Sequence, residues 1–320
     1  MPTQLRRRGN RLQVVHEGKV VGSVALTRKA GRVKTRGRHY GSLRRGWRYG
    51  TFMMLPTAGN QTNEALVKGR LDDVKALGIG FTWEALSTTL TDSDLTNLLT
   101  WYATRDMKLI LKYGAIAVVP DPANPAAERA WLDVVGQHPN FMAYFTVDEP
   151  FNAPVNYTVA QMRQLYTSLK SSHPHVKQMV SWSGQITQGA PYTNLFGTGM
   201  ADIHNINIQE FDSDPADVLD DGFARLQRAV GIIRQRDGSA EVQCSCNVHL
   251  PDPNPRNLFN PTAGQMESLV LRVWQDYGRD LKSFVWSVWE SATATDVNIS
   301  DSPALQSGVA HIYNRYVRYG

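Results

Sequence analysis

The chain has 320 residues, 42% hydrophobic and 20% charged, which is the balance of an ordinary globular protein. No stretch of 18 or more apolar residues occurs, so the sequence predicts no membrane span. The N-terminus is basic without a following apolar segment, and we expect no secretory signal peptide.

The net charge of +5 is distributed unevenly. Residues 1–48 carry 14 Lys and Arg and one acidic residue, Glu17, whereas the remainder carries 20 basic and 28 acidic residues. Basic arms bind nucleic acid, anionic surfaces or protein partners. This arm has few aromatic side chains to stack on bases, so we expect a solvated extension or an assembly contact rather than a nucleic-acid site.

Two β-rich runs in residues 11–27 flank Glu17-Gly18 and predict a small hairpin, followed by an extended basic stretch. From Tyr49 onward, short apolar strands alternate with amphipathic helices. The predicted strands span residues 49–55, 79–86, 108–114, 141–150, 176–184, 201–211, 240–250 and 281–291. The predicted helices lie near residues 62–77, 91–105, 125–137, 158–172, 215–236, 262–278 and 303–317, and the segment after the fifth strand is predicted as a loop or a brief helix.

Eight strand–helix units of this kind demand a parallel sheet, and their number and length fit a (β/α)8 TIM barrel. The alternative is a doubly wound open sheet, which usually has a Gly-rich turn after its first strand. Here that turn, residues 55–61, contains one glycine, which favours the barrel. We therefore predict a basic arm over residues 1–48 and a barrel over residues 49–320.

The cysteines give no cofactor signal. Cys244 and Cys246 are two apart, so on a strand they face the same side, and they are too close for an ordinary disulfide. A metal site would need further ligands, and His249 is the one local candidate. We expect neither a metal nor another cofactor.

Active sites of TIM barrels lie at the C-terminal ends of the strands. The side chains that we predict there are Glu84, Lys112, Tyr113, Asp148, Glu149, Trp182, Asn207, Glu210, Asn247, His249, Trp286, Trp289 and Glu290. Carboxylates, amides and indoles suit a carbohydrate, because sugar rings stack on indoles and their hydroxyls bond to acids and amides. No strand ends in an arginine, which argues against an anionic substrate.

Each of these residues also has a structural interpretation. The three tryptophans fit a core as well as a binding platform, and Glu84 and Glu290 fit buried charge partners. Asp148 fits a cap, and Glu210 competes with Asp212 for the functional role. Lys112 allows a further hypothesis, a lyase or aldolase that forms a Schiff base.

The stretch Tyr144-Phe-Thr-Val-Asp-Glu-Pro150 resembles the acid/base strand of retaining TIM-barrel glycoside hydrolases. In that clan the fourth strand ends in Asn-Glu, often followed by Pro, and the Glu is the acid/base. Glu149 matches the Glu and Asp148 replaces the Asn. Residues 287–291, SVWES, are similar to the aromatic eighth strand of the clan. The resemblance covers residues 49–320 and implies a glycosidase.

The seventh strand departs from the clan, which places its nucleophilic Glu there. Residues 242–250 read VQCSCNVHL, with no acid before Asp252. The adjacent Asp-Glu pair resembles the hexosaminidases that work by substrate assistance, in which Asp148 would orient an acetamido group and Glu149 would protonate the leaving oxygen. Alternatively, Glu210 is the nucleophile or base; the two carboxyl groups would then stand about 5–5.5 Å apart for retention and about 6.5–9.5 Å apart for inversion.

Two functional hypotheses follow. The first is a glycoside hydrolase with a carbohydrate substrate. The second is a non-catalytic glycan-binding or structural module, such as a virion or phage tail component that docks through residues 1–48. We accordingly expect a cytoplasmic or virion-associated protein.

Overall fold

Two compact units, Met1–Ser42 and Leu43–Gly320, make up the chain. Within the strands of the first unit and residues 218–225 and 247, the backbone alone is described. This computed structural model describes residues 4–8, 11–16, 19–25, 48–52, 61–116, 118–151, 155–182, 198–208, 218–247, 261–277, 280–287 and 299–317.

The first unit contains a three-stranded antiparallel sheet in the order β1 (Gln4–Arg8), β2 (Arg11–His16) and β3 (Lys19–Ala25). Strands β2 and β3 form the predicted hairpin, and β1 adds a strand that we did not predict. Arg48, which we assigned to the arm, is the first residue of a barrel strand.

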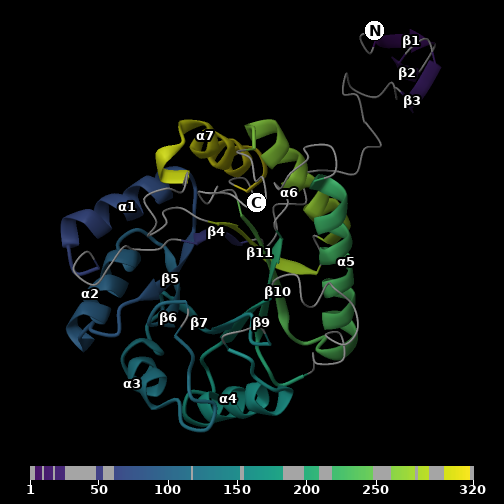
Figure 1. Cartoon of the computed structure of the whole chain (residues 1–320). Helices are drawn as coiled ribbons and strands as arrows, with labels where there is room; N and C mark the ends of the chain where they lie inside the picture. The colour runs from purple at the N-terminus through teal and green to yellow at the C-terminus, as the bar shows by residue number, and fades with distance from the viewer. Residues whose placement is uncertain are drawn as a thin grey trace, which may run out of the picture. The chain divides into compact units, whose positions relative to one another are not determined.

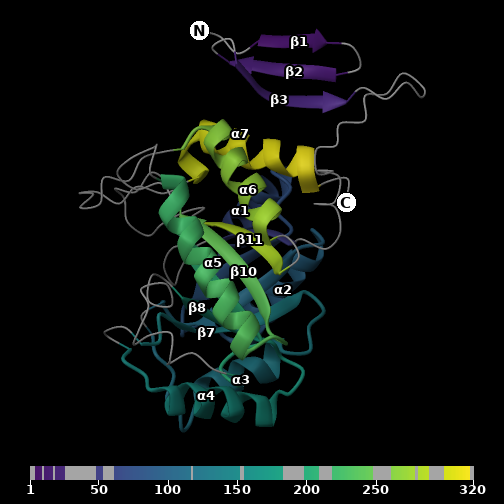
Figure 2. The ribbon, with the colours of Figure 1, turned by 90° about the vertical axis from the view of Figure 1, so that its right-hand side faces the viewer.

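The second unit is a closed barrel of eight parallel strands, surrounded by helices (Figures 1 and 2). Each strand pairs with the next along the chain, and the last pairs with the first, so the TIM-barrel prediction is confirmed and the open sheet is excluded. The strands are β4 (Arg48–Phe52), β5 (Phe81–Leu86), β6 (Lys108–Tyr113), β7 (Phe141–Asp148), β8 (Gln178–Trp182), β9 (Ile203–Ile208), β10 (Glu241–Asn247) and β11 (Leu281–Ser287).

The described helices follow the strands at the predicted places. They are α1 (Glu64–Ala76), α2 (Asp92–Ala103), α3 (Ala126–Val135), α4 (Val159–Ser172), α5 (Val218–Arg236), α6 (Ala263–Tyr277) and α7 (Pro303–Ile312), which continues as a π-helix over Tyr313–Val317. Thr91 and Thr158 are the N-caps of α2 and α4, each with a capping box, so α2 begins where the sequence predicts. None of the described helices is long and apolar enough to cross a membrane. The loop or brief helix predicted after the fifth strand falls at residues 183–197, outside the described residues.

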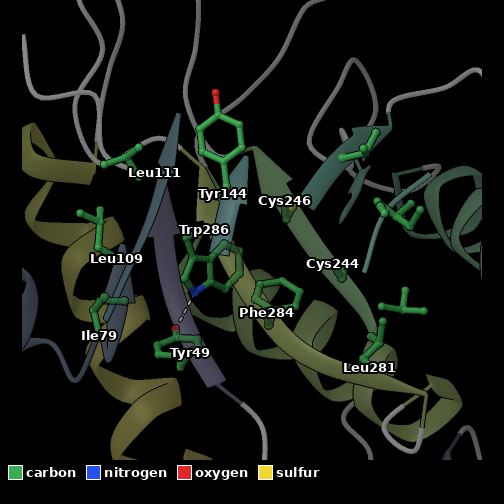
Figure 3. Close-up of a cluster of buried hydrophobic side chains, with 14 of the residues drawn as sticks. Tyr49, Ile79, Leu109, Leu111, Tyr144, Cys244, Cys246, Leu281, Phe284 and Trp286 are labelled. Carbon is green, nitrogen blue, oxygen red and sulfur yellow. Dashed lines mark hydrogen bonds between the residues drawn. The ribbon is translucent and has the colours of Figure 1, made fainter. Parts of the chain in front are cut away.

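Alternation along the strands separates two hydrophobic layers. One set of side chains packs outward against the helices, and Figure 3 shows part of it, including Cys244, Cys246 and Trp286. The other set fills the barrel interior, and it includes Phe52, Phe81, Trp83, Ile110 and Phe145. The two cysteines are buried, form no disulfide and lie on one face of β10, as their spacing predicted.

Gly50 on β4 faces the ring of Phe81 on β5, and the barrel interior leaves no room for a side chain at this glycine. A Cβ added at Gly50 would meet the Phe81 ring, which is itself buried. Gly50→Ala is therefore expected to destabilise the fold by about 1–3 kcal/mol through overpacking, measured by urea denaturation. Gly69→Ala is the control, because nothing lies near that exposed position on α1 and alanine favours a helix. An unchanged stability in Gly50→Ala would contradict this packing.

Candidate active site

The interior of the barrel contains an apolar cluster and a polar network. Strands β4, β5 and β7 contribute aromatic rings to the apolar cluster, with Trp83 packed 4.8 Å from Phe52 and 4.4 Å from Phe145 between ring centroids. Strands β8 to β11 contribute hydroxyl and amide groups to a hydrogen-bonded network, namely Ser181, Asn205, Asn207, Gln243, Ser245 and Ser283. The interior therefore offers both hydrogen bonds, from β8 to β11, and apolar contact, with the aromatic rings coming from β4, β5 and β7.

A β-bulge in β7 determines which carboxylate enters the interior. Phe145 pairs with Met179 and Val147 pairs with Val180, which leaves Thr146 as the extra residue between them. Without the bulge, strict alternation would put Val147 on the same side as Phe145. Instead Val147 packs outward against the helices, and Asp148 comes into register with Ser181 on the interior side.

Two side-chain groups hold the bulge. The Lys112 ammonium, fully buried, donates to the carbonyl oxygens of Thr146 at 3.2 Å and Val118 at 2.8 Å. The Thr146 hydroxyl donates to the Met179 carbonyl at 2.9 Å. The bulge carbonyl, which has left the strand ladder, is thereby satisfied by a charge-assisted hydrogen bond.

Burial raises the pKa of Asp148 to about 6, and the negative charge of Glu149 adds to this rise. A hydrogen bond from the Ser181 side chain and the charge of Lys112 act in the opposite direction. Burial also lowers the pKa of Lys112 to about 8, against the charges of Asp148 and Glu128. Buried titratable groups shifted in this way are typical of functional sites.

Glu149 has a left-handed backbone with φ of 45°, which is rare for a residue of its type. Its N–H donates to the Ser181 carbonyl oxygen at 3.0 Å, so it is the first residue beyond the strand ladder. Strained backbone of this kind gathers at functional sites. Asp148 and Glu149 are both partly exposed, and together they form an adjacent carboxylate pair at the C-terminal end of the fourth barrel strand.

Asn207 shares the interior face with Asp148. Its Oδ1 accepts a hydrogen bond from the Ser245 hydroxyl at 3.4 Å, and the residue is partly exposed. Asn247 is the last residue of β10, two positions beyond Ser245 on the same strand. The structure therefore brings Lys112, Asp148 and Asn207 to one end of the barrel interior.

Two predicted site residues, Glu84 and Tyr113, lie instead between the barrel and the helices. Glu84 is fully buried and accepts hydrogen bonds from the hydroxyls of Thr82 at 2.9 Å and Tyr102 of α2 at 3.0 Å. Tyr113 packs edge-on against Trp131 of α3. Our placement of Glu84 and Tyr113 in the site was wrong, because alternation along β5 and β6 turns them outward.

Trp182 and Trp286 are likewise core residues rather than sugar platforms. The Trp182 indole donates to Nδ1 of His204 at 3.1 Å, and both residues are fully buried. The Trp286 indole donates to the Tyr49 hydroxyl (Figure 3). Both tryptophans belong to the outward-packed layer, which corrects the prediction that they contact substrate.

Glu210, His249, Trp289 and Glu290 lie outside the described residues, and so does the side chain of Asn247. Their predicted roles stay predictions. The described acid of β10, Glu241, stands at the start of that strand and pairs with Arg48 and Lys177.

Of the polar network below the carboxylates, we predicted Asn207 alone, because the prediction rested on the last residues of each strand. Its signal is present in the sequence: polar side chains occupy alternate positions on two consecutive strands, Asn205 and Asn207 on β9 and Gln243 and Ser245 on β10. Such a period of two predicts one polar face on each strand.

Asp148→Asn is expected to raise the free energy of unfolding at pH 7 by about 2–3 kcal/mol, because the pKa of Asp148 is raised to about 6 and each unit is worth about 1.4 kcal/mol. The native state binds the Asp148 proton more tightly than the unfolded chain does. The free energy of unfolding therefore falls as the pH rises from about 4 to about 6, and the full cost is present above pH 6. The gain should vanish below about pH 4.

Urea denaturation at pH 7 and pH 4 measures this difference. Asp72→Asn is the control with the opposite sign, because hydrogen bonds from Arg105 hold the pKa of Asp72 below its usual value. A loss of stability in Asp148→Asn at pH 7 would contradict this prediction, because it would show that the Ser181 hydrogen bond and the Lys112 charge outweigh the cost of burying the Asp148 carboxylate.

Known proteins share the fold of this chain but not its sequence. No family model matches it, and no curated protein matches it. Similar solved structures include the β-glucuronidase of Ruminococcus gnavus (9% identity, TM-score 0.58, 96% of this chain and 56% of that chain) and the β-galactosidase of Marinomonas ef1 (8%, 0.58, 83% and 59%). Another is the β-glucosidase of Thermotoga maritima (8% identity, TM-score 0.55, 84% of this chain and 97% of that chain).

This chain thus spans less than two thirds of the length of the first two proteins. At such identities the similarity shows the fold alone. The second unit of this chain has the TIM-barrel fold that is found in these glycosidases.

Proposed function

We propose that this chain is a glycoside hydrolase in which Glu149 is the general acid/base. The observation that carries the proposal is the Asp148–Glu149 pair at the C-terminal end of β7, with Asp148 turned into the barrel by a bulge and Glu149 on left-handed backbone. Folding alone requires neither the bulge nor a carboxylate whose burial raises its pKa. Glycosidases with the same fold support the proposal.

The surroundings of the pair fit a carbohydrate. Asn207 and Asp148 offer an amide and a carboxylate at one end of the interior, groups that bond to sugar hydroxyls or to an acetamido group. Glu149 donates its proton to the glycosidic oxygen as the bond breaks, and it later accepts a proton from the attacking water.

The second group distinguishes two mechanisms. In the first, Asp148 is ionised above pH 6 and accepts the N–H of a 2-acetamido group, whose carbonyl oxygen attacks the anomeric carbon. In the second, Glu210 is the nucleophile or base. The described geometry of Asp148 supports the first, because the bulge brings this carboxylate, next to Glu149, to the interior face.

The test is hydrolysis of a panel of aryl glycosides, with and without a 2-acetamido group, by the wild type and by Glu149→Gln. Hydrolysis that depends on Glu149 supports the proposal. A restriction to acetamido substrates supports substrate assistance. Failure of the wild type to hydrolyse any member, in either anomeric series, would contradict the proposal.

A non-catalytic glycan-binding module is the second candidate. It is favoured by one observation: within the described part of β10, the single carboxylate is Glu241 at the beginning of the strand, away from Asp148. This candidate predicts that the same glycosides bind, as measured by calorimetry, without being cleaved. Docking of residues 1–48 on a partner, including a phage tail, stays a prediction.

A further inference from the structure

The polar network inside the barrel contains a series of hydrogen bonds that all run in one direction. The Ser283 hydroxyl donates to Oε1 of Gln243 at 2.7 Å, and Nε2 of Gln243 donates to Oδ1 of Asn205 at 3.2 Å. Nδ2 of Asn205 then donates to Oγ of Ser181 at 3.2 Å. Ser181 donates in turn to Asp148, its registered neighbour on β7.

The direction of this series follows from the chemistry of its members. An amide nitrogen donates and cannot accept, so the Asn205 amide fills an acceptor position of the Ser181 oxygen. The Ser181 proton is then available to the carboxylate. Aligned hydrogen bonds polarise one another in a dry interior, and all four of these side chains are buried.

Other groups act on Asp148 from the neighbouring elements. Lys112 on β6 presents a positive charge, and Glu149 adds a negative charge from the same strand end. Glu128 of α3 is a second carboxylate that interacts with Lys112. Ser181 on β8 is thus a neutral hydrogen-bond donor to Asp148, whereas Lys112 and Glu149 act through their charges. The hydrogen bond from Asn205 directs the Ser181 hydroxyl proton towards Asp148.

We propose that Ser181 and Asn205 are positioning residues that hold Asp148 as an ionised, acceptor-only carboxylate facing the site. The catalytic role of Asp148 in this inference rests on the proposed function. The series of hydrogen bonds, however, acts on Asp148 whether or not the protein cleaves a sugar. An ionised Asp148 can accept a hydrogen bond from the substrate. A protonated Asp148 would present its own O–H, which is a donor, at the position where the substrate donor has to bind.

The test is the titration of Asp148, followed by the 13C shift of its carboxyl carbon and assigned by the loss of that signal in Asp148→Asn. Ser181→Ala is expected to raise the titration midpoint by about one pH unit, because the donor to the anion is lost. Asn205→Leu is expected to raise it by less, because the Ser181 hydroxyl remains but is no longer oriented. If the protein is active, the acid limb of its pH profile for kcat/KM should move in parallel.

Two further variants separate this role from a general disturbance of the barrel. Ser181→Thr keeps the hydroxyl and should retain the wild-type midpoint. Ser283→Ala removes a buried hydroxyl three hydrogen bonds away from Ser181 and should move the midpoint much less than Ser181→Ala does. An unchanged midpoint in Ser181→Ala, or an equal shift in Ser283→Ala, would overturn the proposal. Because the titration needs no turnover, its outcome is independent of whether the chain hydrolyses glycosides.

Discussion

Glu149→Gln is expected to lower kcat for glycoside hydrolysis by about 10²–10⁴-fold, the usual contribution of a general acid/base. The amide keeps the size of the side chain but has no acidic proton to give to the leaving oxygen. The hydrogen bond from the backbone N–H of Glu149 to Ser181 is unaffected, so the strand end should remain in place.

The dependence on the leaving group makes this test specific. A good phenol leaving group needs little protonation, so the rate loss should be small for activated aryl glycosides and large for alkyl glycosides. Glu64→Gln on the exposed surface of α1 is the matched control and should leave the rates unchanged. A loss of equal size for all leaving groups would be inconsistent with Glu149 as the acid.

The sequence predicts the barrel well because strand and helix periods are local properties. Thr91 before an amphipathic stretch indicates where α2 begins, and Thr91 is the N-cap of that helix in the structure. The doubly wound alternative differs in closure, which depends on pairing between β4 and β11, more than 200 residues apart in the chain. The count of eight units predicted that closure indirectly.

The site is harder to predict because one inserted residue reverses the faces of a strand. The bulge at Thr146 turns Asp148 inward, and no residue type in the segment FTVDEP signals it. Glu84 shows the related failure. It stands near a strand end, as a catalytic acid would, but the outward phase of β5 places it against Tyr102. The last residues of a strand therefore include side chains that face the barrel interior and side chains that face the helices, and the phase of each strand is needed to tell them apart.

Lys112→Met is expected to lower the free energy of unfolding at pH 7 by about 3 kcal/mol or more, as for the loss of one member of a buried charge pair. The carbonyl oxygens of Thr146 and Val118 lose their donor, and Asp148 loses the positive charge beside it. Urea denaturation measures the effect. Lys68→Met, on the surface of α1, is the control and should change stability by about 0.5 kcal/mol or less.

The same pair predicts how stability varies with pH. The pKa of Asp148 is raised to about 6, so its ionisation costs stability as the pH rises from about 4 to 6. The pKa of Lys112 is lowered to about 8, so stability returns as the pH rises from about 8 to 10, where the unfolded chain binds more protons. Between pH 6 and 8 both buried groups are charged, and their joint cost is greatest.

A double variant isolates this window. Lys112→Met combined with Asp148→Asn removes both titrations. The unfolding free energy of the wild type minus that of the double variant should therefore be lowest between pH 6 and 8. The double variant should also be less destabilised than Lys112→Met alone, because the two residues are coupled. A flat difference profile would show that the pair does not titrate in this way. In the same window Asp148 is ionised, as the proposed substrate-assisted mechanism requires of the group that accepts the acetamido N–H.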